Sequence, residues 1–529
     1  MGDAHPFPEV SGNEIQVVWF KRDLRLADHA PLRAAAAHGP VWLCYIFEPS
    51  VWRAPDMDAL HWEYVRASLC ELREASFARG AELRLYGGEA ILVLEAIRRA
   101  SAGSLRLWSH EETGNRVTFA RDRAVRAWAR EQGVLWTEFP HNGVVRRLRD
   151  RDGWARHWRE FMRCPVEATP GRLRDAARPL PAIETWDEVP SGAALGLSGA
   201  MREDVTPGGR RHAEELLDSF LLERGRDYSR AMSSPVTAYR ACSRLSAPLA
   251  WGCLSMREVV QRAWARREVL RAEPRRDFPL RSLQSFLSRC HWHCHFMQKL
   301  ETEPEIEFRC FHRGYEALRE RGAHPDRLAA WEAGMTGYPF VDACLRALRT
   351  HGWINFRMRA MLVSFAAYHL WVDWRDFAPW LSRQFVDYEP GIHFSQVQMQ
   401  SGVTGINTLR IYNPVKQGYD HDPGGEFIRR YVPELRDLRG EAVHEPWKTG
   451  GVVGYPLPLV EHVAAVRSAR ASFSEVRRRA ETRTENRRVY QRHGSRAGPV
   501  ARREGGEDPA PFSQWKRDAP LQAEFGFSD

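Results

Sequence analysis

Residues 329–365 read AAWEAGMTGYPFVDACLRALRTHGWINFRMRAMLVSF, and this stretch decides the fold. Its apolar residues recur at three- and four-residue spacing, as Phe340, Cys344 and Leu348 do, and that spacing is typical of packed helices. Arg357 and Arg359 interrupt the apolar run. A buried charge is costly unless it is paired, so we expect Arg359 to form an ion pair with an acidic residue from a neighbouring segment.

The two segments that follow supply the acids and extend the helical pattern. Residues 370–394 read LWVDWRDFAPWLSRQFVDYEPGIHF, and residues 409–435 read LRIYNPVKQGYDHDPGGEFIRRYVPEL. Asp387 and Glu389 follow a hydrophobic helical run, so either one can meet Arg359. We expect the rest of the chain to be arranged around what this region encloses. It also gathers five tryptophans, namely Trp331, Trp353, Trp371, Trp374 and Trp380.

Residues 14–140 alternate between strand-like and helix-like runs. Short apolar runs such as IQVVWF and PVWLCYIF are separated by helical stretches such as HWEYVRASLCELREASFARG. This alternation predicts a doubly wound parallel α/β sheet. Neither a dinucleotide fingerprint nor a phosphate-binding loop follows a strand. Ligands of such sheets bind at the carboxyl ends of the strands, and the loop after the first strand carries Lys21, Arg22, Asp23 and Arg25.

We therefore predict an α/β domain followed by an all-α domain. The first covers residues 14–145, and the second covers residues 211–465. The connector at 146–210 has a basic start and is then rich in Pro, Gly and Ala, as expected for a long connection over the surface. Residues 466–529 form a basic tail that starts with a helical pattern, and its composition leads us to expect partial disorder.

Length and composition are typical of a globular protein with large cores. The chain has 529 residues, of which 43% are hydrophobic and 27% are charged. It contains no run of ~18 uncharged apolar residues and no basic segment followed by an apolar one at its start, so we expect neither a membrane span nor a secretory signal. Nine scattered cysteines fit a reducing cytosol. We expect a cytoplasmic monomer.

The charge balance is basic. Lys and Arg exceed Asp and Glu by 77 − 68 = +9, and the isoelectric point is about 9.2. Neutralisation of phosphates supplies most non-specific affinity for nucleic acid, so this excess favours DNA as a partner. A solvated surface in an arginine-rich protein is the alternative explanation.

Several ordered motifs resemble the photolyase/cryptochrome family, in a divergent bacterial form. They are TGYPFVDA, GWINFRMR, VDYEP and RIYNPVKQGYDHDPGGEF, together with VVWFKRDLRLADHAPL near the start of the chain. The resemblance implies a helical domain that binds FAD without a covalent bond. It also implies an α/β domain that can hold a second, light-harvesting chromophore of folate or deazaflavin type.

The resemblance also assigns the residues around the flavin. CSRLS at 242–246 matches the family's phosphate-binding segment, although Cys242 stands where Thr is usual, and a helix cap without a ligand is the alternative for these serines. Arg359 and Asp387 match the charged pair beside the ring, and His393 falls where the family faces flavin N5. The assigned cofactor residues are Ser243, Arg244, Leu245, Ser246, Trp292, Arg357, Arg359, Asp387, Glu389 and His393.

SFLSRCHWHCHFMQKL at 285–300 is the most unusual run. His291 and His295, and likewise Cys290 and Cys294, are four residues apart, a spacing that can place two ligands on one metal. No further paired ligands follow nearby, so we favour packed side chains and expect no metal. The family carries other residue types at four substrate-side positions, which here are Arg289, His293, Phe356 and Met399.

The family's usual electron relay has three tryptophans, and the match to it is incomplete. Trp331 and Trp374 match the two outer members, whereas Val397 stands at the inner position. Trp371, Trp353 or Trp380 could substitute for the missing ring.

Two functions follow from the resemblance. The first is an FAD-dependent DNA photolyase, a lyase that repairs pyrimidine photoproducts by light-driven electron transfer after the damaged base is flipped out of the stack. The second is a blue-light photoreceptor of cryptochrome type without repair activity. A basic chain favours repair, and the altered substrate-side residues favour signalling. A light-independent flavin oxidoreductase is a weaker third interpretation, because no nicotinamide fingerprint is present.

Overall fold

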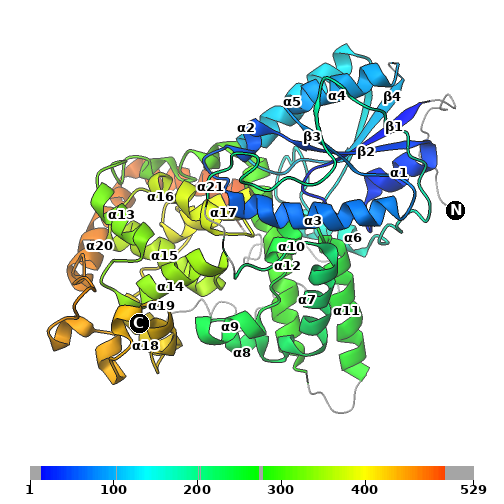
Figure 1. The fold of residues 1–529 in the computed structure, drawn as a ribbon. Coiled ribbons are helices and arrows are strands. Elements are labelled where there is room, and N and C mark those ends of the chain that lie inside the picture. Colours follow the sequence, from blue (N-terminus) through cyan, green and yellow to red (C-terminus); the bar gives the residue numbers. More distant parts are fainter. Residues whose placement is uncertain (1–13, 103, 200–201, 203, 273–277, 495–529) are drawn as a thin grey trace.

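The computed structural model describes residues 14–102, 104–199, 202, 204–272 and 278–494. Its first part is a six-stranded sheet in the order β5-β4-β1-β2-β3-β6, in which β6 alone runs antiparallel (Figure 1). The doubly wound parallel sheet is thereby confirmed, with an antiparallel edge strand supplied by the connector. The strands are β1 (Ile15–Phe20), β2 (Val41–Phe47), β3 (Arg84–Gly87), β4 (Leu105–His110), β5 (Leu135–Phe139) and β6 (Glu184–Trp186).

Helices cover both faces of the sheet, because its central strands are apolar on both sides. In β1, Val18 and Phe20 pack with α1 and α3, whereas Val17 and Trp19 face α4 and α5 on the other side (Figure 1). The helices of this domain are α1 (Ala30–His38), α2 (Pro49–Trp52), α3 (Ala59–Phe77), α4 (Ala90–Ala100) and α5 (Arg116–Glu131), and α6 (Trp154–Arg163) follows in the connector.

The second part is all helical, as predicted. Its helices are α7 (Arg210–Leu222), α8 (Tyr228–Ala231), α9 (Pro235–Ala241), α10 (Ser246–Ala250), α11 (Met256–Ala272), α12 (Leu280–Thr302), α13 (Pro325–Ala333), α14 (Pro339–His351), α15 (Phe356–Ser364), α16 (Trp374–Gln384), α17 (Pro390–Gln400), α18 (Pro414–His421), α19 (Glu426–Tyr431), α20 (His462–Arg478) and α21 (Ala480–His493). A π-helical turn, η4 (Phe365–His369), follows α15. No described helix has both the length and the apolar character that a membrane crossing requires.

The helical domain continues beyond the expected boundary at residue 465. That boundary falls inside α20, which packs on η4 through Ala469 and Phe473, and α21 buries Val489 and His493. The His493 imidazole lies 2.7 Å from the Glu303 carboxylate at the end of α12. The first part of the basic tail is therefore folded onto the domain. Residues 495–529, where we expected disorder, lie outside the described residues.

The α/β domain forms hydrogen bonds with one loop of the helical domain, residues 385–389. His61 of α3 donates a hydrogen bond to the carbonyl of Phe385 over 2.9 Å, and Arg22 donates to the carbonyl of Tyr388. The Tyr388 hydroxyl in turn donates to the Asp56 carboxylate. This loop, which carries Asp387 and Glu389, is thus positioned by both domains.

Candidate functional site

The predicted ion pair of Arg359 is present, and its partner is Asp387. Nη1 and Nη2 of Arg359, on α15, lie 3.0 and 2.8 Å from the two carboxylate oxygens of Asp387, which is a bidentate pair. The Asp387 side chain is 2% exposed and that of Arg359 is 23% exposed. Arg359 Nε donates to the Ile354 carbonyl over 2.7 Å, so the guanidinium is held from two sides.

The Ser243–Ser246 segment is brought beside α15 by aromatic contacts. It joins α9 to α10, and Arg244 within it has a positive φ of 62°, which a tight turn requires. The Arg244 guanidinium lies 4.1 Å from the centre of the Trp353 ring, and the Tyr239 hydroxyl donates to the Trp353 carbonyl over 2.7 Å. The predicted phosphate-binding segment and the Arg359–Asp387 pair therefore belong to one region.

His393, on α17, is held as a neutral imidazole. Its Nε2 lies 3.0 Å from the carbonyl of Ala378, and because a carbonyl only accepts hydrogen bonds, Nε2 carries the hydrogen. Burial lowers the pKa of His393 to about 4. At neutral pH this side chain presents an unprotonated Nδ1 and cannot act as a proton donor there.

The His/Cys run of α12 packs against α6 in the connector. The His291 ring lies 5.0 Å from both Trp154 and Trp158, and His295 Nδ1 lies 2.5 Å from Arg151 Nη2. His291 is therefore packed between aromatic rings, and His295 is hydrogen-bonded to an arginine. The Trp292 ring stacks on Phe296 of the same helix at 5.6 Å.

One trio of metal-ligand type occurs among the described residues, and it was not foreseen as a cluster. It consists of Asp23, His29 and His110, at the carboxyl edge of the sheet. His29 Nδ1 accepts a hydrogen bond from the amide of Leu32, so Nε2 carries the hydrogen that points at Asp23 over 3.0 Å. His29 has no lone pair left for a metal, and we interpret the trio as a buried hydrogen-bond network.

Three of the predicted relay tryptophans carry a guanidinium over the ring. Arg319 lies 4.7 Å from the Trp371 ring, and its donors point only at the carbonyls of Ala367 and Ser401. A fixed positive charge stabilises a neutral indole but opposes its oxidation. The same holds for Trp353 beside Arg244. These contacts disfavour both rings as bridges for an electron hole.

Trp374 and Trp331 have different surroundings. The Arg375 guanidinium lies 5.1 Å from the Trp374 ring, but it is paired with Asp373 at 3.0 Å and with Glu316. Trp331 is fully buried and packs against Trp380 at 5.1 Å. The Val397 side chain lies in the same apolar core as both rings.

The four substrate-side residues keep partial access to solvent. Phe356 is 37% exposed, and Arg289, His293 and Met399 are half-buried. Arg357 is also half-buried. Partial exposure of this kind suits the mouth of a binding site better than a core.

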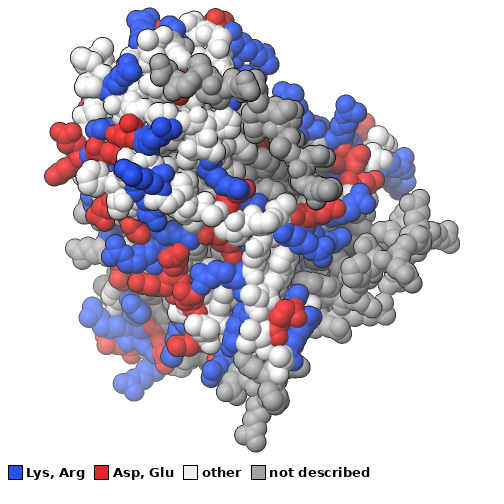
Figure 2. Space-filling view, turned by 90° about the vertical axis from the view of Figure 1, so that its right-hand side faces the viewer, with Lys and Arg blue, Asp and Glu red and all other residues white. Residues whose placement is uncertain are grey.

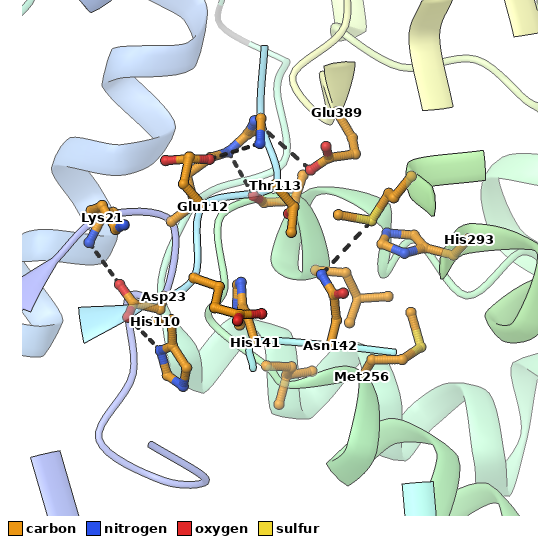
Figure 3. Close-up of a pocket in the computed structure, with 17 residues that line it drawn as sticks. Lys21, Asp23, His110, Glu112, Thr113, His141, Asn142, Met256, His293 and Glu389 are labelled. Atoms are coloured by element: carbon orange, nitrogen blue, oxygen red, sulfur yellow. Dashed lines mark hydrogen bonds and ion pairs between the residues drawn. The ribbon is translucent and has the colours of Figure 1, made fainter. Parts of the chain in front are cut away.

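A pocket between the two domains adjoins this region (Figure 3). Glu389 and His293 reach it from the helical domain, and α17 approaches α12 closely there because a Cβ on Gly391 would lie 2.6 Å from the Cα of Met297. On the other side it is lined by residues that follow β4 and β5, which sequence reasoning missed although they occupy the carboxyl edge of the sheet. These are Glu111, Glu112, Thr113, His141 and Asn142.

Comparison with known proteins agrees with this architecture. Residues 16–162 match the family model described as "DNA photolyase", and residues 286–475 match the "FAD binding domain of DNA photolyase". A deoxyribodipyrimidine photo-lyase from Streptomyces griseus is 30% identical over 496 residues, which cover 88% of this chain and 99% of that protein. The chain belongs to the photolyase/cryptochrome family.

Other relatives span the same range of the family. The deoxyribodipyrimidine photo-lyase of Escherichia coli is 29% identical over 87% of this chain and 99% of its own length, and cryptochrome-1 of Sinapis alba is 29% identical over 85% of this chain and 94% of its own. The crystal structure of a class III photolyase from Agrobacterium tumefaciens matches with a TM-score of 0.75 and 26% identity, over 89% of this chain and 99% of that one. The family membership predicted from the motifs is confirmed.

The residues present fit the FAD that this family's domain binds. Glu389 Oε1, His293 Nδ1 and Asn355 Oδ1 are buried, and none has a hydrogen-bond partner among the residues that the structure describes. Buried polar atoms are normally hydrogen-bonded. Glu389 and His293 line one pocket, so their two unpartnered atoms indicate a polar ligand there. A flavin ring offers both donors and acceptors to groups of this kind.

Proposed function

We propose that this protein is a light-driven DNA photolyase that uses FAD to repair pyrimidine photoproducts. The observation that carries the proposal is the bidentate Arg359–Asp387 pair, with a buried carboxylate, in a chain that matches curated photo-lyases over nearly their whole length. When bound, FAD supplies the light-absorbing ring and the electron that such a repair consumes.

The protein's own residues would bind and orient the cofactor. The serines of the Ser243–Ser246 segment would donate to its phosphates, and Arg359 would place a positive charge beside the ring, which favours a reduced, anionic flavin. Glu389 and His393 would contact the edge of the ring, with His393 as a hydrogen-bond acceptor. Trp292 would line the route to the lesion, together with the substrate-side residues Arg289, His293, Phe356 and Met399.

DNA is the proposed macromolecular partner. On the face shown in Figure 2, Lys and Arg side chains are interspersed with Asp and Glu side chains, so the excess of positive charge is not gathered there in a single patch. A flipped base would therefore be recognised at a local site, and the phosphate backbone would be held by dispersed cations. We further propose that the protein is a monomer, and that it is cytoplasmic, because its nine cysteines are free thiols and suit a reducing compartment.

A second chromophore would occupy the aromatic pocket at the carboxyl ends of β1 and β2. Trp19, Trp52 and Trp251 line this pocket, and Glu48 contributes a buried carboxylate oxygen that has no hydrogen-bond partner among the described residues. Rings of a folate or a deazaflavin would stack on the indoles, and Glu48 would accept a hydrogen bond from the ligand.

Repair of damaged oligonucleotides tests the proposal. Purified protein carrying reduced FAD would be illuminated with blue light in the presence of a strand that holds either a cyclobutane dimer or a (6-4) product, and restored bases would be counted by chromatography. We expect restoration of one lesion in the light and none in darkness. Failure with both lesions, despite reduced FAD, would refute repair and leave the photoreceptor function, which the four altered substrate-side residues favour.

A further inference from the structure

The pocket between the two domains is large enough for water, and acidic residues from both domains line it, among them Glu112 and Glu389 (Figure 3). The volume open to water is about 30 Å³. Since one water needs roughly 10–15 Å³ of such space, the pocket holds about two. Glu389 lines it from the helical domain, and Glu111 lines it from the loop after β4.

Glu389 is buried, and its nearest guanidinium lies beyond hydrogen-bond distance. Its side chain has Oε1 unpaired among the described residues and Oε2 at 3.8 Å from Arg22 Nη1. Arg22 directs its donors at the carbonyls of Ala250 and Tyr388 instead. Burial, with repulsion from the nearby Glu112, raises the pKa of Glu389 to about 7 although Arg22 opposes the shift.

Of the other ionisable groups near Glu389, two carboxyl groups are paired with guanidiniums and one imidazole is buried. Glu112 is paired with Arg121 at 2.5 Å and accepts the amide hydrogen of Gly114. Burial lowers the pKa of His293 to about 4, so it offers an acceptor to water rather than a proton. On Glu389's own loop, Asp387 is engaged by both nitrogens of Arg359.

Glu111 differs from Glu112 in being open to solvent. It is half-buried, and burial raises the pKa of its carboxyl, with Arg146 and Lys21 nearby to moderate the rise. A partly exposed carboxyl group with a raised pKa can exchange protons with bulk water. The pocket thus joins a solvent-facing acid to a buried acid through a space that holds water.

We propose that the interdomain pocket is a water-filled proton path that opens to solvent at Glu111 and ends on Glu389. The inference rests on the proposed function in that Glu389 lies beside the bound FAD. When the flavin accepts electrons from a reductant, the added negative charge favours protonation of Glu389, and one proton moves from bulk water through Glu111 and the pocket waters to its carboxylate. Oxidation of the flavin reverses the movement.

The pH dependence of the flavin potential tests the end of the path. The midpoint potential of FAD in the loaded protein would be measured against pH by titration with dithionite, for wild type, Glu389→Gln and Glu332→Gln. Glu332 is a matched control, because burial raises the pKa of this carboxyl on α13, outside the pocket. In wild type, reduction by two electrons is coupled to the uptake of one proton by Glu389. Glu389→Gln cannot take up this proton, so the slope of its midpoint potential against pH should be smaller by about 30 mV per pH unit. A slope equal to that of wild type would overturn the proposal.

Glu111→Gln tests the entrance. We expect this variant to keep the wild-type slope but to take up its proton roughly tenfold more slowly, as followed with a pH-indicator dye after rapid mixing with dithionite. An unchanged rate would overturn the entrance at Glu111.

A cofactor-free measurement separates this inference from the proposed function. In the infrared difference spectrum between pH 6 and pH 8, wild type should show a carboxylic-acid band that Glu389→Gln lacks, whether or not FAD is bound. Absence of that band in wild type would refute a titrating Glu389. Protein that shows the band and the slope but restores no lesion would refute repair and leave the proton path standing.

Discussion

Replacing Arg359 by Ala should destabilise the protein more than replacing Asp387 by Asn. Arg359→Ala removes two charge-assisted hydrogen bonds from a carboxylate whose side chain is 2% exposed, and it also leaves the Ile354 carbonyl without its donor. Removing one partner of a buried pair costs about 3–5 kcal/mol. Asp387→Asn leaves a guanidinium that is 23% exposed and still bonded to Ile354, so water can compensate and the cost should be about 1–3 kcal/mol.

Urea unfolding followed by tryptophan fluorescence measures both values, and the FAD retained after gel filtration reports on the site. Arg359→Lys is the matched control, because it keeps the charge and loses the bidentate geometry, so its cost should lie between those of wild type and Arg359→Ala. The double variant Arg359→Ala/Asp387→Asn should cost less than the sum of the single variants, because the two residues interact directly. Equal and negligible losses in both single variants would refute the argument from burial.

Three further predictions follow from the geometry. Photoreduction of oxidised FAD should be slowed more by Trp374→Phe than by Trp353→Phe or Trp371→Phe, because guanidiniums oppose oxidation of the latter two rings; time-resolved bleaching of the flavin checks this, and a larger effect at Trp353 or Trp371 would contradict it. The pKa of Glu389 is about 7 in the folded protein against 4.5 in an unfolded chain, so the folded state binds an extra proton and the free energy of unfolding decreases as the pH rises from 5 to 8. In urea unfolding, Glu389→Gln should reduce this decrease by up to about 3 kcal/mol. The logarithm of DNA affinity should fall linearly with the logarithm of salt concentration and should favour damaged strands, as measured by fluorescence anisotropy; indifference to salt or to damage would contradict the DNA-repair interpretation.

Local sequence patterns were sufficient to predict the two domains of the fold. β-branched and aromatic runs separated by helical periodicity predicted the parallel sheet. A charge inside an apolar helix predicted an ion pair of Arg359 with Asp387 or Glu389, because an unpaired buried charge is too costly to persist, and the family resemblance singled out Asp387. Three-residue β6 escaped prediction because a strand in a Pro-rich connector gains its stability from pairing with β3, which no local pattern records. The packing of α21 against the helical domain could not be predicted from the sequence either, because its buried residues Val489 and His493 are isolated in an arginine-rich segment.

The candidate site was predictable where its residues fall within recognisable motifs or where a buried charge demands a partner. Arg359 and the Ser243–Ser246 segment could be named from motifs, and the structure brings them together. The interdomain pocket could not be predicted, because Glu111 and Glu389 are brought to one cavity by the packing of two domains. The partners of His291 on α6 were hidden for the same reason, since α6 comes from the connector.

The hydrogen bonds between the α/β domain and residues 385–389 couple the stability of the domain interface to the conformation of this loop. The backbone that carries Asp387 and Glu389 is held from across the interface by His61, Arg22 and Asp56. The proposed contacts of FAD with this loop would, by reciprocity, stabilise the interface between the domains by the same coupling free energy with which the interface stabilises FAD binding. The helical domain expressed by itself would therefore bind FAD more weakly. An α/β domain taken from another protein would restore this affinity only if it carried counterparts of His61, Arg22 and Asp56.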